Sequence, residues 1–221
     1  MEVASAKTLR RLVLDTGLTA TCVAMMAMFA AEAAFADNSA PPTIMVLIHN
    51  HSRAPQSVVD GAEREAGRVF AQAGVRVLWL TCSTGASADE SDTCQKKSND
   101  TLRLELLSSG TAKSRGWVCG FAIHPDLARV LYEDVFNLAK TYEMEGSVSR
   151  ILGGVMAHEI GHLLLGPNAH AGIGVMRSSW SFDEVRQSAM GTLSFTPEQS
   201  RIMRAAVPRR EQAKHGIYPA L

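Results

Sequence analysis

The first half of the chain carries two kinds of hydrophobic pattern. Residues 43–49 form an apolar, β-branched run that is typical of a buried strand, and residues 75–80 form a second run of the same kind. Between them, residues 55–73 place apolar side chains on one side at helical spacing, and Gly74 ends the pattern. A strand, a helix and a strand in this order predict a parallel pair joined by a right-handed crossover.

The middle of the chain predicts three more strands and another helix. Residues 101–107 alternate leucine with polar residues, which indicates a half-exposed strand. Residues 116–123 and 128–132 flank a turn that contains Pro125, and they predict an antiparallel hairpin. Residues 134–143 have a helical pattern.

A more continuously apolar segment, residues 151–165, predicts a buried helix that starts near Ser147 or Ser149, both good N-cap residues. Gly153 and Gly154 lie inside it, although each glycine weakens a helix by about 1 kcal/mol. We therefore expect close backbone packing against the sheet at these two positions. A last helix is expected from Thr196 and Pro197, which suit the N-cap and first helical positions, to about Val207.

Three residues whose side chains bind metal ions or exchange protons interrupt the predicted apolar helix: His158, Glu159 and His162. Residues four apart share a helix face, so both imidazoles can reach one metal ion. Catalytic zinc takes three protein ligands and leaves a fourth position for water. Glu159 points about 100° round the helix from His158, so it is placed to act on the water as a general base.

The third ligand is expected after the helix ends. Gly166 can adopt the left-handed conformation that follows a helix, and Pro167 cannot continue it. A turn there can bring His170 back beneath the histidine pair. A downstream acid, Asp183 or Glu184, is the alternative, because some zinc enzymes use a carboxylate ligand.

The chain resembles the metzincin clan of zinc peptidases, whose pattern is HExxHxxGxxH followed by a methionine turn. Six residues match that pattern in order: His158, Glu159, His162, Gly166, His170 and Met176. The glycine and the third histidine each come after a gap of four residues rather than the family's three. The resemblance implies an α/β (α+β) fold, with a mixed twisted sheet packed on the crossover helix and the HExxH helix.

The resemblance also implies a chemistry. Zn²⁺ would be held by His158, His162 and His170, Met176 would pack beneath the metal without binding it, and Glu159 would act as the general base of a zinc metalloendopeptidase. A peptide or protein substrate would pair with the sheet edge at residues 117–123. Two alternatives stay open: a zinc hydrolase that cleaves another ester or amide, and a secreted binding protein with a structural zinc site.

Residues 1–36 predict a secretory signal peptide. Lys7, Arg10 and Arg11 form a basic start, residues 18–31 are largely apolar, and residues 34–36 read Ala-Phe-Ala, a cleavage site. The apolar run is shorter than the span of about 20 residues that a membrane helix needs. We expect residues 37–221 to be a single catalytic domain, secreted or periplasmic, with no stable membrane association after cleavage.

The net charge bears on the expected binding partners, and the cysteine content bears on the expected disulfides. Lysine and arginine total 22, as do aspartate and glutamate, so the net charge is zero and nothing favours nucleic acid. We expect a monomer. In an oxidising compartment, Cys82 and Cys94 are predicted to form a disulfide across the polar segment between them, which leaves Cys119 as a buried thiol.

Overall fold

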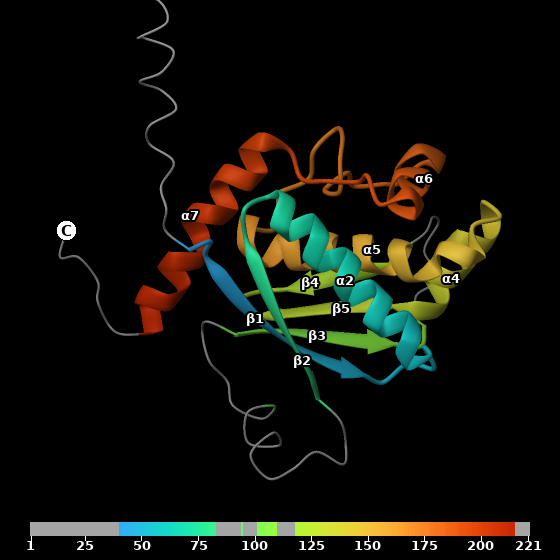
Figure 1. The fold of residues 1–221 in the computed structure, drawn as a ribbon, viewed down its shortest axis with the longest axis horizontal. Helices are drawn as coiled ribbons and strands as arrows, with labels where there is room; N and C mark the ends of the chain where they lie inside the picture. The colour runs from blue at the N-terminus through green and yellow to red at the C-terminus, as the bar shows by residue number, and fades with distance from the viewer. Residues whose placement is uncertain (1–39, 83–93, 95–100, 110–117, 215–221) are drawn as a thin grey trace, which may run out of the picture. The chain divides into compact units, whose positions relative to one another are not determined.

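A five-stranded sheet organises the protein in the computed structural model, which describes residues 40–82, 94, 101–109 and 118–214 (Figure 1). Its order is β2-β1-β3-β5-β4. The first four strands of that order are parallel, and β4 is antiparallel to β5 at the edge of this described sheet. The strands are β1 (Thr43–Asn50), β2 (Arg76–Cys82), β3 (Thr101–Leu107), β4 (Gly120–Ile123) and β5 (Leu127–Leu131).

The strand–helix–strand start is confirmed. Helix α2 (Gln56–Gln72) connects β1 to β2, and the two strands pair in parallel. Gly74 adopts a positive φ of 76° in the turn after the helix, which few other residues tolerate. One side of α2 is buried, as its apolar spacing predicted.

The strands in the middle of the chain follow the prediction with shifted ends. Leu102, Leu104 and Leu106 of β3 face the core and are fully buried, while Arg103 and Glu105 are half-buried on the other face. The hairpin of β4 and β5 is antiparallel, but β4 begins at Gly120 rather than at residue 116. Helix α4 (Tyr132–Thr141) takes Tyr132, which had been assigned to the strand. Residues 116 and 117 lie outside the described part of the chain.

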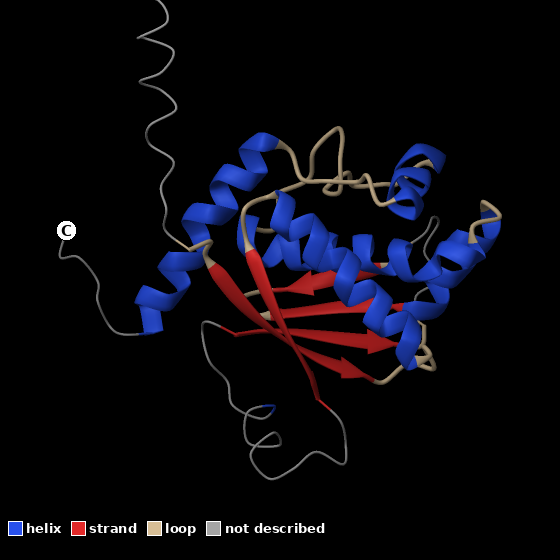
Figure 2. Ribbon diagram, in the orientation of Figure 1, coloured by secondary structure: helices blue, strands red, loops and turns tan. Residues whose placement is uncertain are grey.

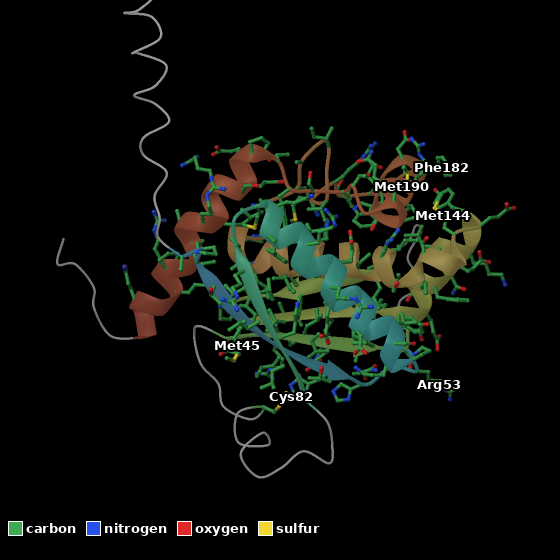
Figure 3. The ribbon with its side chains drawn as sticks, in the orientation of Figure 1. Met45, Arg53, Cys82, Met144, Phe182 and Met190 are labelled. Atoms are coloured by element: carbon green, nitrogen blue, oxygen red, sulfur yellow. A yellow bond between two sulfur atoms is a disulfide. The ribbon has the colours of Figure 1, made fainter. Side chains whose placement is uncertain are left out.

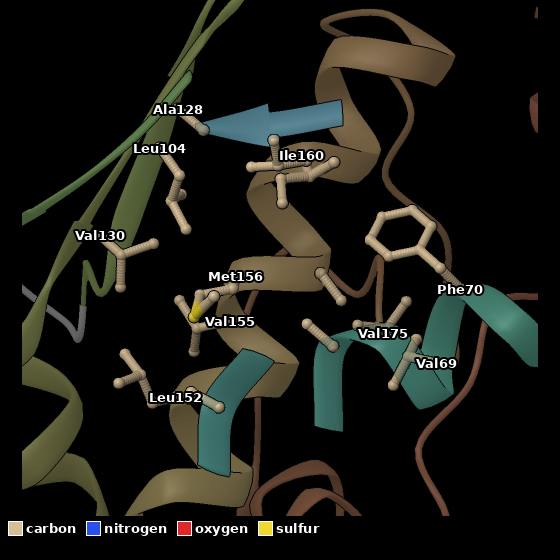
Figure 4. Packing of buried hydrophobic residues seen from close by; sticks show 14 of the residues in the cluster. Val69, Phe70, Leu104, Ala128, Val130, Leu152, Val155, Met156, Ile160 and Val175 are labelled. Carbon is tan, nitrogen blue, oxygen red and sulfur yellow. The ribbon is translucent and has the colours of Figure 1, made fainter. Parts of the chain in front are cut away.

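Helix α5 (Val148–Leu165) is the central element of the core. It starts after Ser147, as predicted, and follows a short 3₁₀ turn, η1 (Glu145–Ser147). Figure 2 shows the sheet with helices packed on it, and Figure 4 shows side chains of α5, such as Met156, between those of β3 and β5 and those of α2. Apolar residues buried nearly all round α5 are expected of a helix enclosed by other elements.

The two glycines inside α5 mark close packing, but their partners are not the sheet. A Cβ atom at Gly153 would lie 2.6 Å from the backbone oxygen of Ala62 in α2. At Gly154 it would meet Ser188 and, at 2.9 Å, the indole of Trp180. The prediction of packing against the sheet is therefore wrong: these glycines accommodate the crossing with α2 and the segment at α6.

Helix α6 (Phe182–Met190) was not predicted. A capping box starts it, because the side chain of Ser181 accepts a hydrogen bond from a backbone N–H and Glu184 binds back to the backbone of Ser181. Gly191 ends it in the left-handed conformation, with φ 72°. Figure 3 labels Phe182 and Met190 at the two ends of this helix, and both are largely exposed.

Helix α7 (Pro197–Lys214) begins as predicted and ends later. Thr196 and Gln199 exchange backbone and side-chain hydrogen bonds at its start. The helix continues through Pro208 instead of ending near Val207, although proline removes one helical hydrogen bond. Beyond the proline, the Arg210 guanidinium donates hydrogen bonds to the carbonyl oxygens of Leu163, 3.4 Å away, and Pro125, 3.2 Å away.

The predicted disulfide is present between Cys82, at the end of β2, and Cys94 (Figure 3). Cys119 is a free thiol. The predicted signal peptide lies outside the described residues. Among the helices that are described, none combines the length and apolar character that a membrane span requires. From Pro41 onward the described residues belong to one compact unit.

Candidate active site

Three imidazoles converge at the C-terminal half of α5. The Nε2 atom of His162 lies 3.2 Å from Nε2 of His158 and 3.1 Å from Nε2 of His170. All three donor atoms lie within 4.8 Å of one another. The structure thus brings together the three histidines that the sequence singled out.

The turn after α5 brings His170 into this group. The backbone N–H of Gly166 still donates to the carbonyl of His162, at 2.9 Å, and then the chain changes direction. Gly166 has φ 102° and ψ 170°, which is not the predicted left-handed helical conformation but a region that is essentially restricted to glycine. Gln199 of α7 donates its amide to the carbonyl of Ala169, which fixes the loop just before His170.

Hydrogen bonds to carbonyls determine which imidazole nitrogens carry protons. Nδ1 of His158 lies 2.7 Å from the Val175 carbonyl oxygen, and Nδ1 of His162 lies 3.3 Å from that of Gly166. A carbonyl oxygen only accepts, so in the neutral rings both Nδ1 atoms are protonated and both Nε2 atoms present lone pairs. Two facing lone pairs 3.2 Å apart repel each other unless a cation lies between them.

The donor set fits zinc. Tetrahedral Zn²⁺ with Zn–N bonds of about 2.0–2.1 Å separates its nitrogen ligands by roughly 3.4 Å, close to the separations seen here. The ligand must be neutral imidazole. Burial lowers the pKa of His158 to about 4 despite the opposing hydrogen bond to Val175, and burial also lowers the pKa of His162. Both rings are therefore neutral near pH 7.

Glu159 lies beside the imidazoles and is buried, with only 5% of its surface exposed. It lines a cavity of about 470 Å³ together with the three histidines. Burial raises the pKa of Glu159 to about 8. A carboxyl group with a raised pKa in a cleft is typical of groups that exchange protons during catalysis.

The turn that contains Met176 packs against α5 and contacts His158. Met176 is fully buried, and its sulfur lies against Gly161, so close that a Cβ there would be 2.6 Å away. The preceding carbonyl, Val175, accepts hydrogen bonds from Nδ1 of His158 and from Nε1 of Trp180, the latter at 3.2 Å. Sequence reasoning did not identify Val175, because its role belongs to a backbone oxygen.

The alternative carboxylate ligands are engaged elsewhere. Glu184 accepts hydrogen bonds from the backbone and hydroxyl of Ser181 and pairs with Arg177, with an oxygen–nitrogen distance of 2.7 Å. Asp183 is exposed on α6 and lies 3.9 Å from Arg186. Of the candidates for a third ligand, the structure therefore places His170, and neither acid, beside His162.

Other residues of the cavity were not expected there. Cys119 was predicted to be a buried thiol in a strand, but it precedes β4, is half-buried and lines the cavity. Burial, with the nearby carboxylates of Asp134 and Glu159, raises its pKa to about 12, so it is a protonated thiol near pH 7. Arg177 and Trp180 also line the cavity, and no sequence motif pointed to either.

Two solved structures share this fold. A zinc-dependent peptidase from Methanocorpusculum labreanum aligns with a TM-score of 0.50 and 15% identity over 72% of this chain and 99% of its own. Archaemetzincin from Methanopyrus kandleri aligns with a TM-score of 0.50 and 19% identity over 78% of this chain and 99% of its own. The predicted fold class is confirmed. Neither a protein-family model nor a curated protein matches the sequence.

Proposed function

We propose that this protein is an exported zinc-dependent metallopeptidase. One observation carries the proposal: three imidazole nitrogens converge within ligand distance beside a buried glutamate that faces the same cavity. The arrangement provides three protein ligands and one separate acid–base group, which is the composition of a catalytic zinc site. The fold shared with zinc peptidases is consistent with this reading.

The residues have distinct roles in this proposal. His158, His162 and His170 hold Zn²⁺, and the hydrogen bonds from Nδ1 of His158 and His162 orient the first two rings. Zinc held by these residues would polarise a peptide carbonyl and lower the pKa of a bound water molecule. Glu159 accepts a proton from the attacking water and returns it to the leaving amine, so the peptide bond is replaced by a carboxylate and an amine.

The proposed substrate is a peptide in extended conformation. Strand β4 forms the edge of the described sheet, and Val118 through Ala122 contribute to the cavity wall. An edge strand offers unpaired backbone groups, to which a peptide can add as a further strand. This favours cleavage within a chain, as in an endopeptidase.

Export is part of the proposal. The basic start, apolar run and Ala-Phe-Ala site of residues 1–36 have the form of a cleavable signal peptide. The disulfide between Cys82 and Cys94 supports it, because such bonds persist in oxidising compartments. We therefore propose that the mature protein is secreted or periplasmic, without stable membrane association.

The decisive experiment compares the parent with Glu159→Gln, which keeps the volume and leaves the ligands untouched. Metal content is measured by mass spectrometry, and cleavage of a mixed peptide library is measured beside simple esters. Both proteins should contain a single zinc ion, and the variant should lose about 10²–10⁴-fold in kcat. Glu198→Gln, at an exposed glutamate of α7, is the matched control and should retain full activity.

Three outcomes would redirect the proposal. Parent protein that cleaves esters but no peptide is a zinc hydrolase of another class. Parent protein that holds zinc and cleaves nothing is a binding protein with a structural metal. A Glu159→Gln variant with zinc and near-parental peptidase activity removes Glu159 from the base role.

A further inference from the structure

Strand β4 turns its two smallest residues toward α5. Gly120 is paired with Val130 and Ala122 with Ala128, and both partners belong to the buried core face of the sheet. Phe121 lies on the opposite face, and 39% of its surface is exposed. The strand can therefore approach α5 closely at Gly120.

The side chain at that point of approach belongs to Glu159. A Cβ atom added to Gly120 would lie 2.8 Å from Cγ and 2.8 Å from Oε1 of Glu159, and 2.7 Å from the backbone oxygen of Arg129. These separations are shorter than the 3.4 Å at which ordinary contact begins. The carboxyl group of Glu159 thus occupies the space where any other residue at position 120 would carry its side chain.

The backbone of β4 packs against the buried carboxyl group of Glu159. On one side lies the backbone of Gly120, which is fixed because β4 pairs with β5 and the N–H of Leu131 donates to the Cys119 carbonyl at 2.8 Å. The strand therefore acts as a wall against which the carboxyl group rests.

We infer that Gly120 is a positioning residue for catalysis: its missing side chain sets the place of the Glu159 carboxyl group relative to the three imidazoles. The inference rests on the proposed function, in which Glu159 is the general base. A methyl group at position 120 must displace the carboxyl group by about 0.6 Å to reach ordinary contact, because the backbone of Arg129 blocks the other direction. A misplacement of about 1 Å can cost roughly 10²-fold in rate.

The first test is Gly120→Ala in the full zinc-loaded protein. We expect kcat to fall by about 10–10²-fold, with KM within a few-fold of the parent and with full zinc content. Gly146→Ala is the matched control, because a Cβ at Gly146 would meet nothing within 4 Å, and it should leave kcat unchanged. A Gly120→Ala variant with parental kcat would overturn the inference.

A second test separates positioning from a general distortion of β4. Glu159→Ala removes both Cγ and the carboxyl group, so a methyl group at position 120 then meets only the backbone oxygen of Arg129, at 2.7 Å. In the Glu159→Ala background, adding Gly120→Ala should therefore lower the residual kcat by a smaller factor than it lowers kcat in the parent. An equal loss in both backgrounds would show that Gly120→Ala acts through the strand and would also contradict the inference.

The same double-mutant cycle can be measured by thermal unfolding, which requires no catalytic activity. Gly120→Ala should lower Tm in the parent and lower it less in the Glu159→Ala background, since the side chains at the two positions touch. Equal Tm losses in the two backgrounds would contradict the contact itself. Failure of the proposed function gives a different result, which is independent of the Tm values. In that case the parent is inactive, or Glu159→Gln remains active.

Discussion

Replacing Gly153 with alanine tests how tightly α2 and α5 cross. Two effects oppose each other at this position. Alanine is favoured over glycine inside a helix by about 0.8–1.0 kcal/mol. Against that, the new methyl carbon would lie 2.6 Å from the Ala62 carbonyl oxygen and 2.7 Å from Cβ of Glu65. Contact with the Ala66 nitrogen, at 3.1 Å, adds to the overlap.

The cost of this overlap exceeds the gain in helix propensity. Two of the three atoms belong to the backbone of α2, so no rotation of a side chain relieves the contact, and the helices must separate by about 0.8 Å at the crossing. Overpacking costs about 1–3 kcal/mol, and a backbone-limited site falls at the upper end. The net loss is about 2 kcal/mol, which corresponds to a fall in Tm of roughly 4–8 °C for a domain of this size.

Thermal unfolding followed by circular dichroism, at one fixed zinc concentration, measures this loss. Gly146→Ala is again the control and should change the free energy of unfolding by less than about 0.5 kcal/mol. A Gly153→Ala protein that melts above the parent would refute the reasoning, because propensity would then outweigh packing.

Three further results are expected. His170→Ala should weaken zinc retention strongly in dialysis against a chelator; full retention there would exclude His170 as a ligand. Glu184→Ala should keep its zinc but lower the free energy of unfolding by about 1–2 kcal/mol, since it loses a helix cap and the pairing with Arg177; loss of zinc instead would restore the carboxylate alternative. Peptide mapping of the unreduced protein should find Cys82 linked to Cys94, and a linkage of either to Cys119 would contradict the structure.

Elements with a strong hydrophobic period could be read from the sequence. In β3, leucine alternates with Arg103 and Glu105, and the structure puts the leucines in the core and pairs Glu105 with Arg129 at 2.8 Å on the other face. A period of two over several residues identifies both the strand and its buried face. The helical spacing of the apolar residues in 55–73 predicted α2 in the same way, to within a residue at each end.

Helix α6 could not be recognised from its period, because only a short stretch is involved and few of its side chains are apolar and buried. Its signal was local instead: Ser181 followed three residues later by Glu184 is a capping-box pattern. The sequence analysis treated Glu184 only as a possible metal ligand and therefore did not predict a helix from this pattern. The structure uses the same carboxylate to start a helix.

The lengthened spacing before His170 also has a physical account. Helix α5 includes Leu165, one residue more than the metzincin pattern, which the sequence resembles, has before its glycine, and an added residue rotates the exit of the chain by about 100°. One more residue between Gly166 and His170 lets the turn bring the His170 imidazole back beside that of His162. The sequence alone shows the two insertions but not that they compensate, because this depends on backbone angles at Gly166.

The hydrogen bonds of Arg210 have a consequence for how the protein matures. One guanidinium joins the end of α5, at Leu163, to the turn between β4 and β5, at Pro125. Each of these two segments also contributes a residue to the lining of the cavity, His162 in α5 and His124 in the turn. Because a chain is synthesised from its N-terminus, both segments exist before the residue that joins them. The two hydrogen bonds therefore form only after α7 has been synthesised, and a nascent chain that lacks α7 also lacks this connection between the two segments.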